Sequence, residues 1–387
     1  MARLASLDGL RGVAAIAVVA EHVLLTAPPM WRAFLAGRPK AWDLADLLTY
    51  TPLHLAWAGG EAVAIFYVLS GLVLSLPFWA GRQPGYGAYV VQRLFRLWPV
   101  YLFAAALSGA LYFAAARPPP IGVSAWFRQY WAVAPTAMDA LRAALFMPGD
   151  LLKLNSPFWT LIHELRISMA LPFILLAVRR WPAGSLIAGL GLSCAARIAL
   201  GHGFVPPGDL ANLAETLVQV WYFVAGALLA RHWPAIGERL ARTPAWAVAC
   251  AGAASLILLL AQWLTPAPST VAFVCTGVGA VGVVALVGAA PRLRGLFSKP
   301  VATGLGAISY PLYALHFPLI VAAVLVFTPM TGNVQLAAVA GAAIALALAG
   351  LTTLALERPM MTLGRRLTHR LPVAGVAAAP AAEPPKA

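Results

Sequence analysis

Charge is scarce in this 387-residue sequence: 27 Lys and Arg and 13 Asp and Glu make up only 10% of the chain. Soluble domains carry roughly 25% charged residues. Hydrophobic residues reach 61%, and the mean hydropathy is +0.81. These values exclude a soluble globular enzyme and a disordered chain, and they indicate a protein that folds in lipid.

Cysteine is nearly absent as well. The three cysteines, Cys194, Cys250 and Cys275, each lie inside an apolar stretch and share no paired spacing. Such residues pack as small apolar side chains, and their number and spacing imply neither a disulfide nor a metal cluster. We therefore expect no metal cofactor.

Lys and Arg outnumber Asp and Glu by about two to one, which gives a formal net charge of +14. The arginines collect in short loops between apolar stretches, as the positive-inside bias requires. No basic patch alternates with stacking aromatics outside those stretches, so we expect no nucleic-acid partner. The partner that this composition predicts is the lipid bilayer.

Apolar runs of about 20 residues, the length that spans a bilayer, are abundant. We predict an all-α fold, a polytopic membrane helix bundle of about ten transmembrane helices. The predicted spans are residues 7–27, 53–78, 97–116, 157–178, 183–200, 212–230, 244–264, 270–290, 303–327 and 334–356. Residues 130–148 are aromatic but are interrupted by Pro135, Asp139 and Arg142, which predicts an interfacial segment.

One membrane domain is predicted over residues 1–370, multi-pass in the inner (plasma) membrane of the cell. Charges within residues 7–27 argue against a cleaved signal peptide, so we expect a retained first helix. Residues 371–387 are rich in Ala and Pro and are predicted to be disordered. With both termini inside, inner loops and tails hold eighteen Lys and Arg and outer loops seven, which favours an N-in, C-in topology.

Ionisable residues inside membrane spans are costly, so each is a candidate site residue. In the first span, Arg11 and His22 are eleven residues apart and therefore share one helix face. The pKa of histidine lies near neutrality, which suits His22 to remove a proton from a hydroxyl group. The alternative is a buried histidine bonded to a neighbouring helix.

Two arginines mark the inner end of the third span. Arg93 and Arg96 are three residues apart and face the same way on a helix. Two convergent guanidinium groups suit phosphate oxygens. The alternative is a positive anchor at the inner membrane surface.

The fourth span carries a dense polar cluster, His163, Glu164 and Arg166. His163 and Arg166 share a face, whereas Glu164 points about 100° away from His163. Such density predicts a polar cavity. In the second span, Glu61 is a further candidate, either as a catalytic group or as a structural partner of an arginine.

The ninth span contains Tyr313 and His316, three residues apart. This spacing places them on neighbouring positions of one face, where they are expected to line the same cavity. The alternative for His316 is a plain structural hydrogen-bond donor.

Taken together and in order, these segments resemble acyltransferase family 3, a family of membrane proteins. Its Arg-x10-His opening matches at Arg11 and His22, its Arg-x-x-Arg motif at Arg93 and Arg96, and its Trp-Ser-Leu-x-x-Glu acid at Glu164, although Thr160 replaces the serine. The matching segments are LDGLRGVAAIAVVAEH, GGEAVAIFYVLSG, RLFR, PFWTLIHELRISMALP, SYPLYALHFP and LERP, spread over residues 7–359.

This resemblance implies O-acyl transfer from cytoplasmic acyl-CoA, with acetyl-CoA as the expected donor, to a hydroxyl of a surface glycan or a small glycosylated natural product. It implies a catalytic role for His22 with support from Arg11, a catalytic role for Glu164, and donor binding by Arg93 and Arg96. His22 then acts as a general base or carries the acyl group transiently. The alternative function is a multi-pass transporter or flippase of a glycan or a lipid-linked sugar, although we see no pair of matching broken spans.

Overall fold

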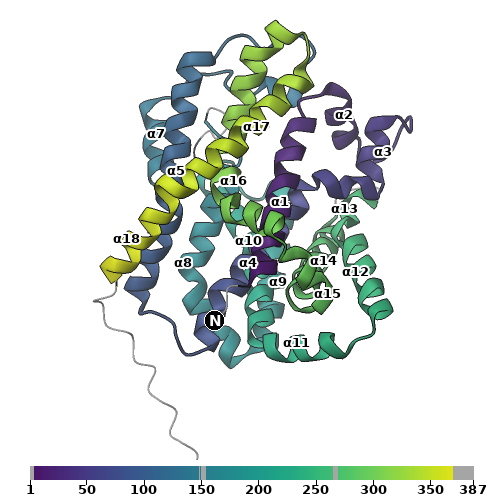
Figure 1. Ribbon diagram of the computed structural model, residues 1–387, viewed down its shortest axis with the longest axis vertical. Coiled ribbons are helices and arrows are strands. Elements are labelled where there is room, and N and C mark those ends of the chain that lie inside the picture. Colours follow the sequence, from purple (N-terminus) through teal and green to yellow (C-terminus); the bar gives the residue numbers. More distant parts are fainter. Residues whose placement is uncertain (1–3, 148, 150–153, 265–268, 369–387) are drawn as a thin grey trace, which may run out of the picture.

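The computed structural model describes residues 4–147, 149, 154–264 and 269–368, and within these ranges it contains helices and no strand (Figure 1). The predicted disordered tail, residues 371–387, lies outside the described residues. The longer helices are α1 (Ala5–Leu24), α4 (Gly59–Trp79), α5 (Tyr86–Ala115), α8 (Phe158–Arg180), α9 (Pro182–Gly201), α10 (Asp209–Arg231), α12 (Ala245–Leu259), α14 (Thr270–Ala289), α16 (Pro300–Thr331) and α17 (Val334–Thr352). An all-α polytopic bundle is thereby confirmed.

Shorter helices connect these. They are α2 (Pro28–Ala36), α3 (Leu44–Tyr50), a 3-10 helix (Pro52–Trp57), α6 (Ala125–Arg128), α7 (Ala137–Ala144), α11 (Trp233–Arg242), α13 (Ala261–Leu264), α15 (Pro291–Phe297), a π-helical turn (Thr353–Glu357) and α18 (Arg358–Thr368). The predicted interfacial segment 130–148 contains only the short α7 within its described part.

Each of the ten predicted spans coincides with a helix, but not every helix crosses a bilayer by length and hydropathy alone. Among the described residues, eight helices pass that test, and a ninth span arises if α1 and α2 count together across their 109° bend. The remaining predicted span, residues 244–264, contains α12. Its 15 residues reach about 22 Å, short of the roughly 30 Å hydrocarbon core. The chain is a multi-pass membrane protein.

Small residues bring α1 and α16 into backbone contact at the centre of the bundle. A Cβ atom added to Gly306 of α16 would lie 2.0 Å from the Asp8 carbonyl oxygen, and one added to Gly12 would lie 2.5 Å from the Gly306 nitrogen. Glycine permits this close approach between membrane helices. The contact fixes the height of α1 relative to α16, and with it the polar side chains that the two helices carry.

The turn between α16 and α17 is set by local chemistry. Gly332 ends α16 with a left-handed φ of 67°, and the side chain of Asn333 caps α17 by accepting a hydrogen bond from the Leu336 N–H. The two helices therefore pack against each other, and α17 continues through the π-helical turn into α18 (Figure 1). In Figure 1, α17 and α18 together cross the bundle, and α18 lies against α5.

Helix α5 starts at Tyr86, eleven residues before the predicted span at 97–116. Arg93 and Arg96 therefore lie inside a continuous 30-residue helix, not at its first turn. Arginine lowers the hydropathy of this segment, yet its long side chain leaves the helical backbone unchanged. From this helix, both guanidinium groups reach into the bundle.

Candidate active site

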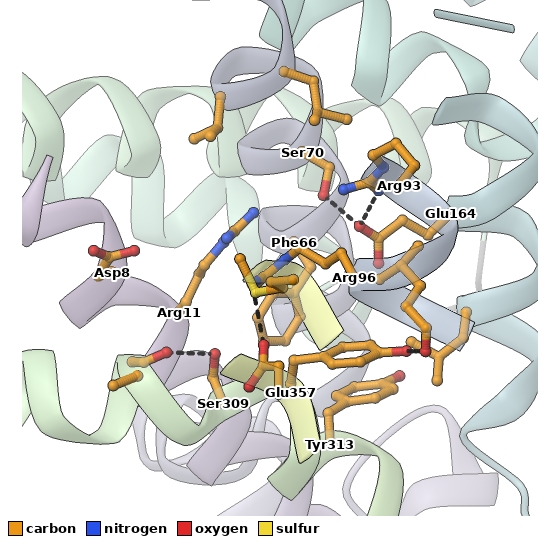
Figure 2. A pocket seen from close by; sticks show the side chains of 18 of the residues that line it. Asp8, Arg11, Phe66, Ser70, Arg93, Arg96, Glu164, Ser309, Tyr313 and Glu357 are labelled. Atoms are coloured by element: carbon orange, nitrogen blue, oxygen red, sulfur yellow. Dashed lines mark hydrogen bonds and ion pairs between the residues drawn. The ribbon is translucent and has the colours of Figure 1, made fainter. Parts of the chain in front are cut away.

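A cavity of about 700 Å³ lies between α1, α4, α5, α8, α16 and the C-terminal helices (Figure 2). Five arginines and three carboxylates line it, which gives a formal charge of +2 at neutral pH. The charged lining residues are Asp8, Arg11, Arg93, Arg96, Glu164, Glu357, Arg358 and Arg365. Arg358 and Arg365 are exposed, so the cavity opens beside α18.

Glu164 of α8 is held between α4 and α5. Its Oε1 accepts hydrogen bonds from Ser70 Oγ at 3.0 Å and from Arg93 Nη2 at 3.2 Å (Figure 2). Arg93 is only 8% exposed, and its Nε also contacts Ser168 Oγ at 3.4 Å. Charge-assisted bonds of this kind hold a buried carboxylate in one orientation. Glu164 and Arg93 therefore form a fixed pair in the cavity wall.

Arg96 makes a second, separate ion pair. Its Nη1 lies 3.1 Å from Glu357 Oε1 and 2.9 Å from Met361 Sδ. Glu357 ends the π-helical turn and is 4% exposed. Sequence reasoning did not single out this residue, although a carboxylate at the end of an apolar stretch, in the segment LERP, is the signal that points to it.

Arg11 extends into the same cavity from α1 (Figure 2). Among the described residues it makes no hydrogen bond or ion pair, in contrast to Arg93 and Arg96. A guanidinium group without a bonded carboxylate leaves its five donors available. The cavity thus offers a positive group that a bound anion can reach.

Aromatic side chains close the cavity at the level of Tyr313 on α16. The Tyr313 hydroxyl and Thr160 Oγ1 share a hydrogen bond of 2.7 Å, and the Phe66 ring packs edge-on against Tyr313 with centroids 5.7 Å apart. All three residues line the cavity. Its lining on α16 runs from Gly306 to Tyr313 and goes no further.

His316 lies beyond this closure, one helical turn past Tyr313 on α16, and contacts His22 of α1. His316 Nε2 is 3.3 Å from His22 Nδ1, and the rings of Tyr313 and His316 are 6.0 Å apart. Neither histidine lines the cavity, so the expectation that His316 does is corrected. The reason is that the Tyr313–Thr160 contact ends the open space before it reaches this turn.

The hydrogen bonds of the two histidines define their tautomers. His22 Nδ1 lies 2.9 Å from the Val18 carbonyl oxygen, and His316 Nδ1 lies 3.0 Å from the Leu312 carbonyl oxygen. Because a carbonyl only accepts, each neutral ring carries its proton on Nδ1. His22 Nδ1 then also donates toward the bare Nε2 of His316. The Nε2 of His22 keeps its lone pair, which is what a general base requires.

The polar cluster on α8 divides between two faces, which corrects the expectation of one polar cavity there. Glu164 faces the cavity, whereas His163 Nδ1 bonds Thr216 Oγ1 of α10 at 2.9 Å and Arg166 Nη1 bonds Asn212 Oδ1 at 2.6 Å. Because neighbouring helical residues are about 100° apart, His163 and Arg166 both point away from the side of α8 that carries Glu164. His163 and Arg166 therefore tie α8 to α10.

A second cavity, of about 800 Å³, lies on that other side of α8. Its polar lining residues are Trp159, Arg197, His202, Glu215, Gln219 and Thr270.

Glu61, another cavity candidate, lies elsewhere at the start of α4. Its Oε1 accepts a hydrogen bond from Trp263 Nε1 at 2.7 Å, and its Oε2 lies 3.7 Å from His54 Nε2. The partner is therefore an indole and not the arginine that one alternative predicted. Glu61 joins α4 to α13 and lies outside the cavity lining.

The sequence of this chain is similar to those of known proteins. Residues 4–354 match a family model described as an acyltransferase domain. The chain is similar to Acyltransferase MdmB of Streptomyces mycarofaciens, with 27% identity over 349 residues, which covers 82% of this chain and 79% of that protein. No solved structure matches the chain. On the family match over nearly its whole length, this chain belongs to acyltransferase family 3 and is a multi-pass membrane acyltransferase.

Proposed function

We propose that the protein is an O-acyltransferase that moves an acyl group, in the first instance acetyl, from acyl-CoA to a hydroxyl of a surface glycan or a glycosylated small molecule. The observation that carries the proposal is a positively charged cavity that ends at Tyr313, one helical turn before His316, which contacts His22. The Nε2 of His22 keeps its lone pair. The proposed setting is the inner membrane, with both termini on the cytoplasmic side.

The donor enters from the cytoplasm under this proposal. The opening beside Arg358 and Arg365 then faces the cytoplasm, and the phosphates of CoA lie near Arg96 and Arg11. Guanidinium groups bind phosphate oxygens in bidentate fashion. A volume of about 700 Å³ is in the range of pockets that hold drug-sized ligands, which suits the pantetheine arm and its thioester.

The acceptor hydroxyl is activated by His22. Its Nε2 removes the hydroxyl proton as the oxygen attacks the thioester carbon. Collapse of the tetrahedral intermediate then breaks the C–S bond, and the imidazolium returns the proton to the thiolate, so CoA leaves as the thiol and His22 is neutral again. The imidazolium is stabilised through Nδ1–H by the Val18 carbonyl and His316 Nε2. A route through an acyl group carried on His22 would use the same Nε2. Tyr313 and Thr160 stand between the donor and His22, so their contact opens during the reaction.

The test is acetyl transfer by the purified full-length protein in liposomes. The acceptor is first identified by mass spectrometry of surface glycan and secreted metabolites from cells with and without the gene. His22→Ala is expected to lose at least about 100-fold in turnover, the typical contribution of a general base. His232→Ala, which changes an exposed histidine, serves as the matched control. Undiminished turnover by His22→Ala removes this residue from the mechanism.

Thermal stabilisation by CoA tests the donor separately. A ligand that binds only the folded state raises the melting temperature in a concentration-dependent way. Stabilisation by CoA and acetyl-CoA is expected for an acyl-CoA enzyme, whereas a permease for glycans is not stabilised by either compound.

A further inference from the structure

The two arginines of the Arg-x-x-Arg motif have different surroundings. Arg93 is buried and bonded to both Glu164 and Ser168. The Arg96 side chain is 31% exposed and bonds Glu357 and Met361 of the C-terminal helices. Arg93 thus serves to hold Glu164, and Arg96 is the guanidinium group of this motif that an incoming ligand can contact.

Glu357 is held firmly against Arg96. The π-helical turn directs both Thr353 and Glu357 toward the cavity, and such turns are frequent at functional sites. The following helix, α18, lies close along α5, because a Cβ atom on Gly364 would be only 2.6 Å from Phe95 Cβ. The Arg96–Glu357 geometry is therefore built into the packing of two helices and is not a chance surface contact.

Within the described part of the chain, the two carboxylate oxygens of Glu357 differ in their hydrogen bonding. Oε1 pairs with Arg96, but the buried Oε2 accepts no hydrogen bond among the described residues. A buried carboxylate whose second oxygen accepts no hydrogen bond is stabilised less than a fully bonded one. Glu164, by comparison, accepts from two donors, Arg93 and Ser70.

We propose that Glu357 is a counter-ion that occupies Arg96 in the empty cavity and competes with the phosphates of the donor for it. Glu357 is then a positioning residue that keeps Arg96 at the cavity wall and also limits how tightly the acyl-CoA donor, and the CoA product, bind. The inference rests on the proposed function, since it takes a CoA thioester as the anionic ligand.

The sign of the effect follows from charge. Glu357→Gln keeps an oxygen that accepts from Arg96 and removes one negative charge, which raises the formal charge of the cavity lining from +2 to +3. A polyanion gains from this change, and the gain is screened by salt. On the order of tenfold tighter CoA binding is expected at low ionic strength, with a smaller difference at high ionic strength.

The experiment is isothermal titration of CoA and of pantetheine, which lacks the phosphates, into the full-length protein in nanodiscs. Glu357→Gln is compared with the wild type and with Glu238→Gln, which removes an equal charge from the exposed face of α11. Tighter CoA binding with unchanged pantetheine binding, in Glu357→Gln alone, supports the proposal. A purely structural role would weaken both ligands together.

Unchanged or weaker CoA binding by Glu357→Gln overturns the proposal, as does an equal gain in Glu238→Gln. Should Glu357→Gln fail to fold, Glu357→Asp takes its place, because it keeps the charge but withdraws it from Arg96 by one methylene. That variant is also expected to bind CoA more tightly, and equal or weaker binding overturns the inference. Failure of the wild type to bind CoA rejects the proposed donor instead.

Discussion

The contact between α1 and α16 leaves no room for a methyl group, and Gly306→Ala tests this. The added Cβ atom would lie 2.0 Å from the Asp8 oxygen and 2.5 Å from its carbonyl carbon. Non-bonded heavy atoms settle at about 3.5 Å, so the helices must separate locally by more than about 1 Å. Overpacking of this kind typically costs about 1–3 kcal/mol of unfolding free energy.

The assay is thermal unfolding of the full-length protein in nanodiscs. Gly304→Ala is the matched control, since it lies in the same helix and its added Cβ would meet no atom within 4 Å. We expect Gly306→Ala to melt several degrees lower and Gly304→Ala to match the wild type. Acyl transfer should fall with Gly306→Ala, because α1 and α16 also carry the His22–His316 contact. Equal melting of both variants would refute the close-packing argument.

Three further changes test other contacts. Asp46 accepts hydrogen bonds from the backbone N–H groups of residues 40–42, with Ala41 foremost, and they hold the pKa of its carboxyl below its usual value. Asp46→Asn should therefore lower the melting temperature at neutral pH, and the gap to the wild type should close as the pH falls through that lowered pKa. Trp263→Phe removes an indole donor from a buried carboxylate and should cost about 1–3 kcal/mol of unfolding free energy. His316→Leu removes the acceptor of the α1 imidazole proton and should slow acyl transfer by roughly tenfold.

Each of these changes has its own control. For the indole, Trp246→Phe alters a ring that is 71% exposed, and an equal loss there would contradict the assignment. For the imidazole, His316→Asn supplies an amide acceptor and should restore part of the rate, whereas no difference between Leu and Asn would contradict a hydrogen-bonding role. A gap for Asp46→Asn that persists at every pH would contradict the charge argument.

The helix bundle was predictable because apolar length is a direct consequence of the bilayer's thickness. The bend after Leu24 was missed, although Pro28 at the first position of α2 is a recognised helix start. The early start of α5 was missed as well, since hydropathy does not distinguish an arginine that ends a helix from one that lies within it. Hydropathy reports the solvent of a segment and not its backbone conformation.

The cavity was predictable only in part. The motifs pointed to Arg11, Glu164 and the Arg-x-x-Arg pair, and the structure brings all of them to one cavity. Which carboxylate pairs with which arginine depends on how far each helix is rotated, and a single sequence does not contain that information. Glu357 illustrates this, because a π-helical turn shifts the helical phase by one residue and so redirects its side chain.

The hydrogen bond between Tyr313 and Thr160 has a consequence for the whole cell. The proposed function takes a donor from the cytoplasm and an acceptor at the cell surface, and a continuous water-filled passage between the two sides would let protons run down their gradient. The phenol ring and its partner lie where the cavity lining on α16 ends, and they close the cavity there. Under the proposed function, the same contact separates the acyl-CoA thioester from water on the other side of the membrane, so the thioester is not lost to hydrolysis while no acceptor is bound.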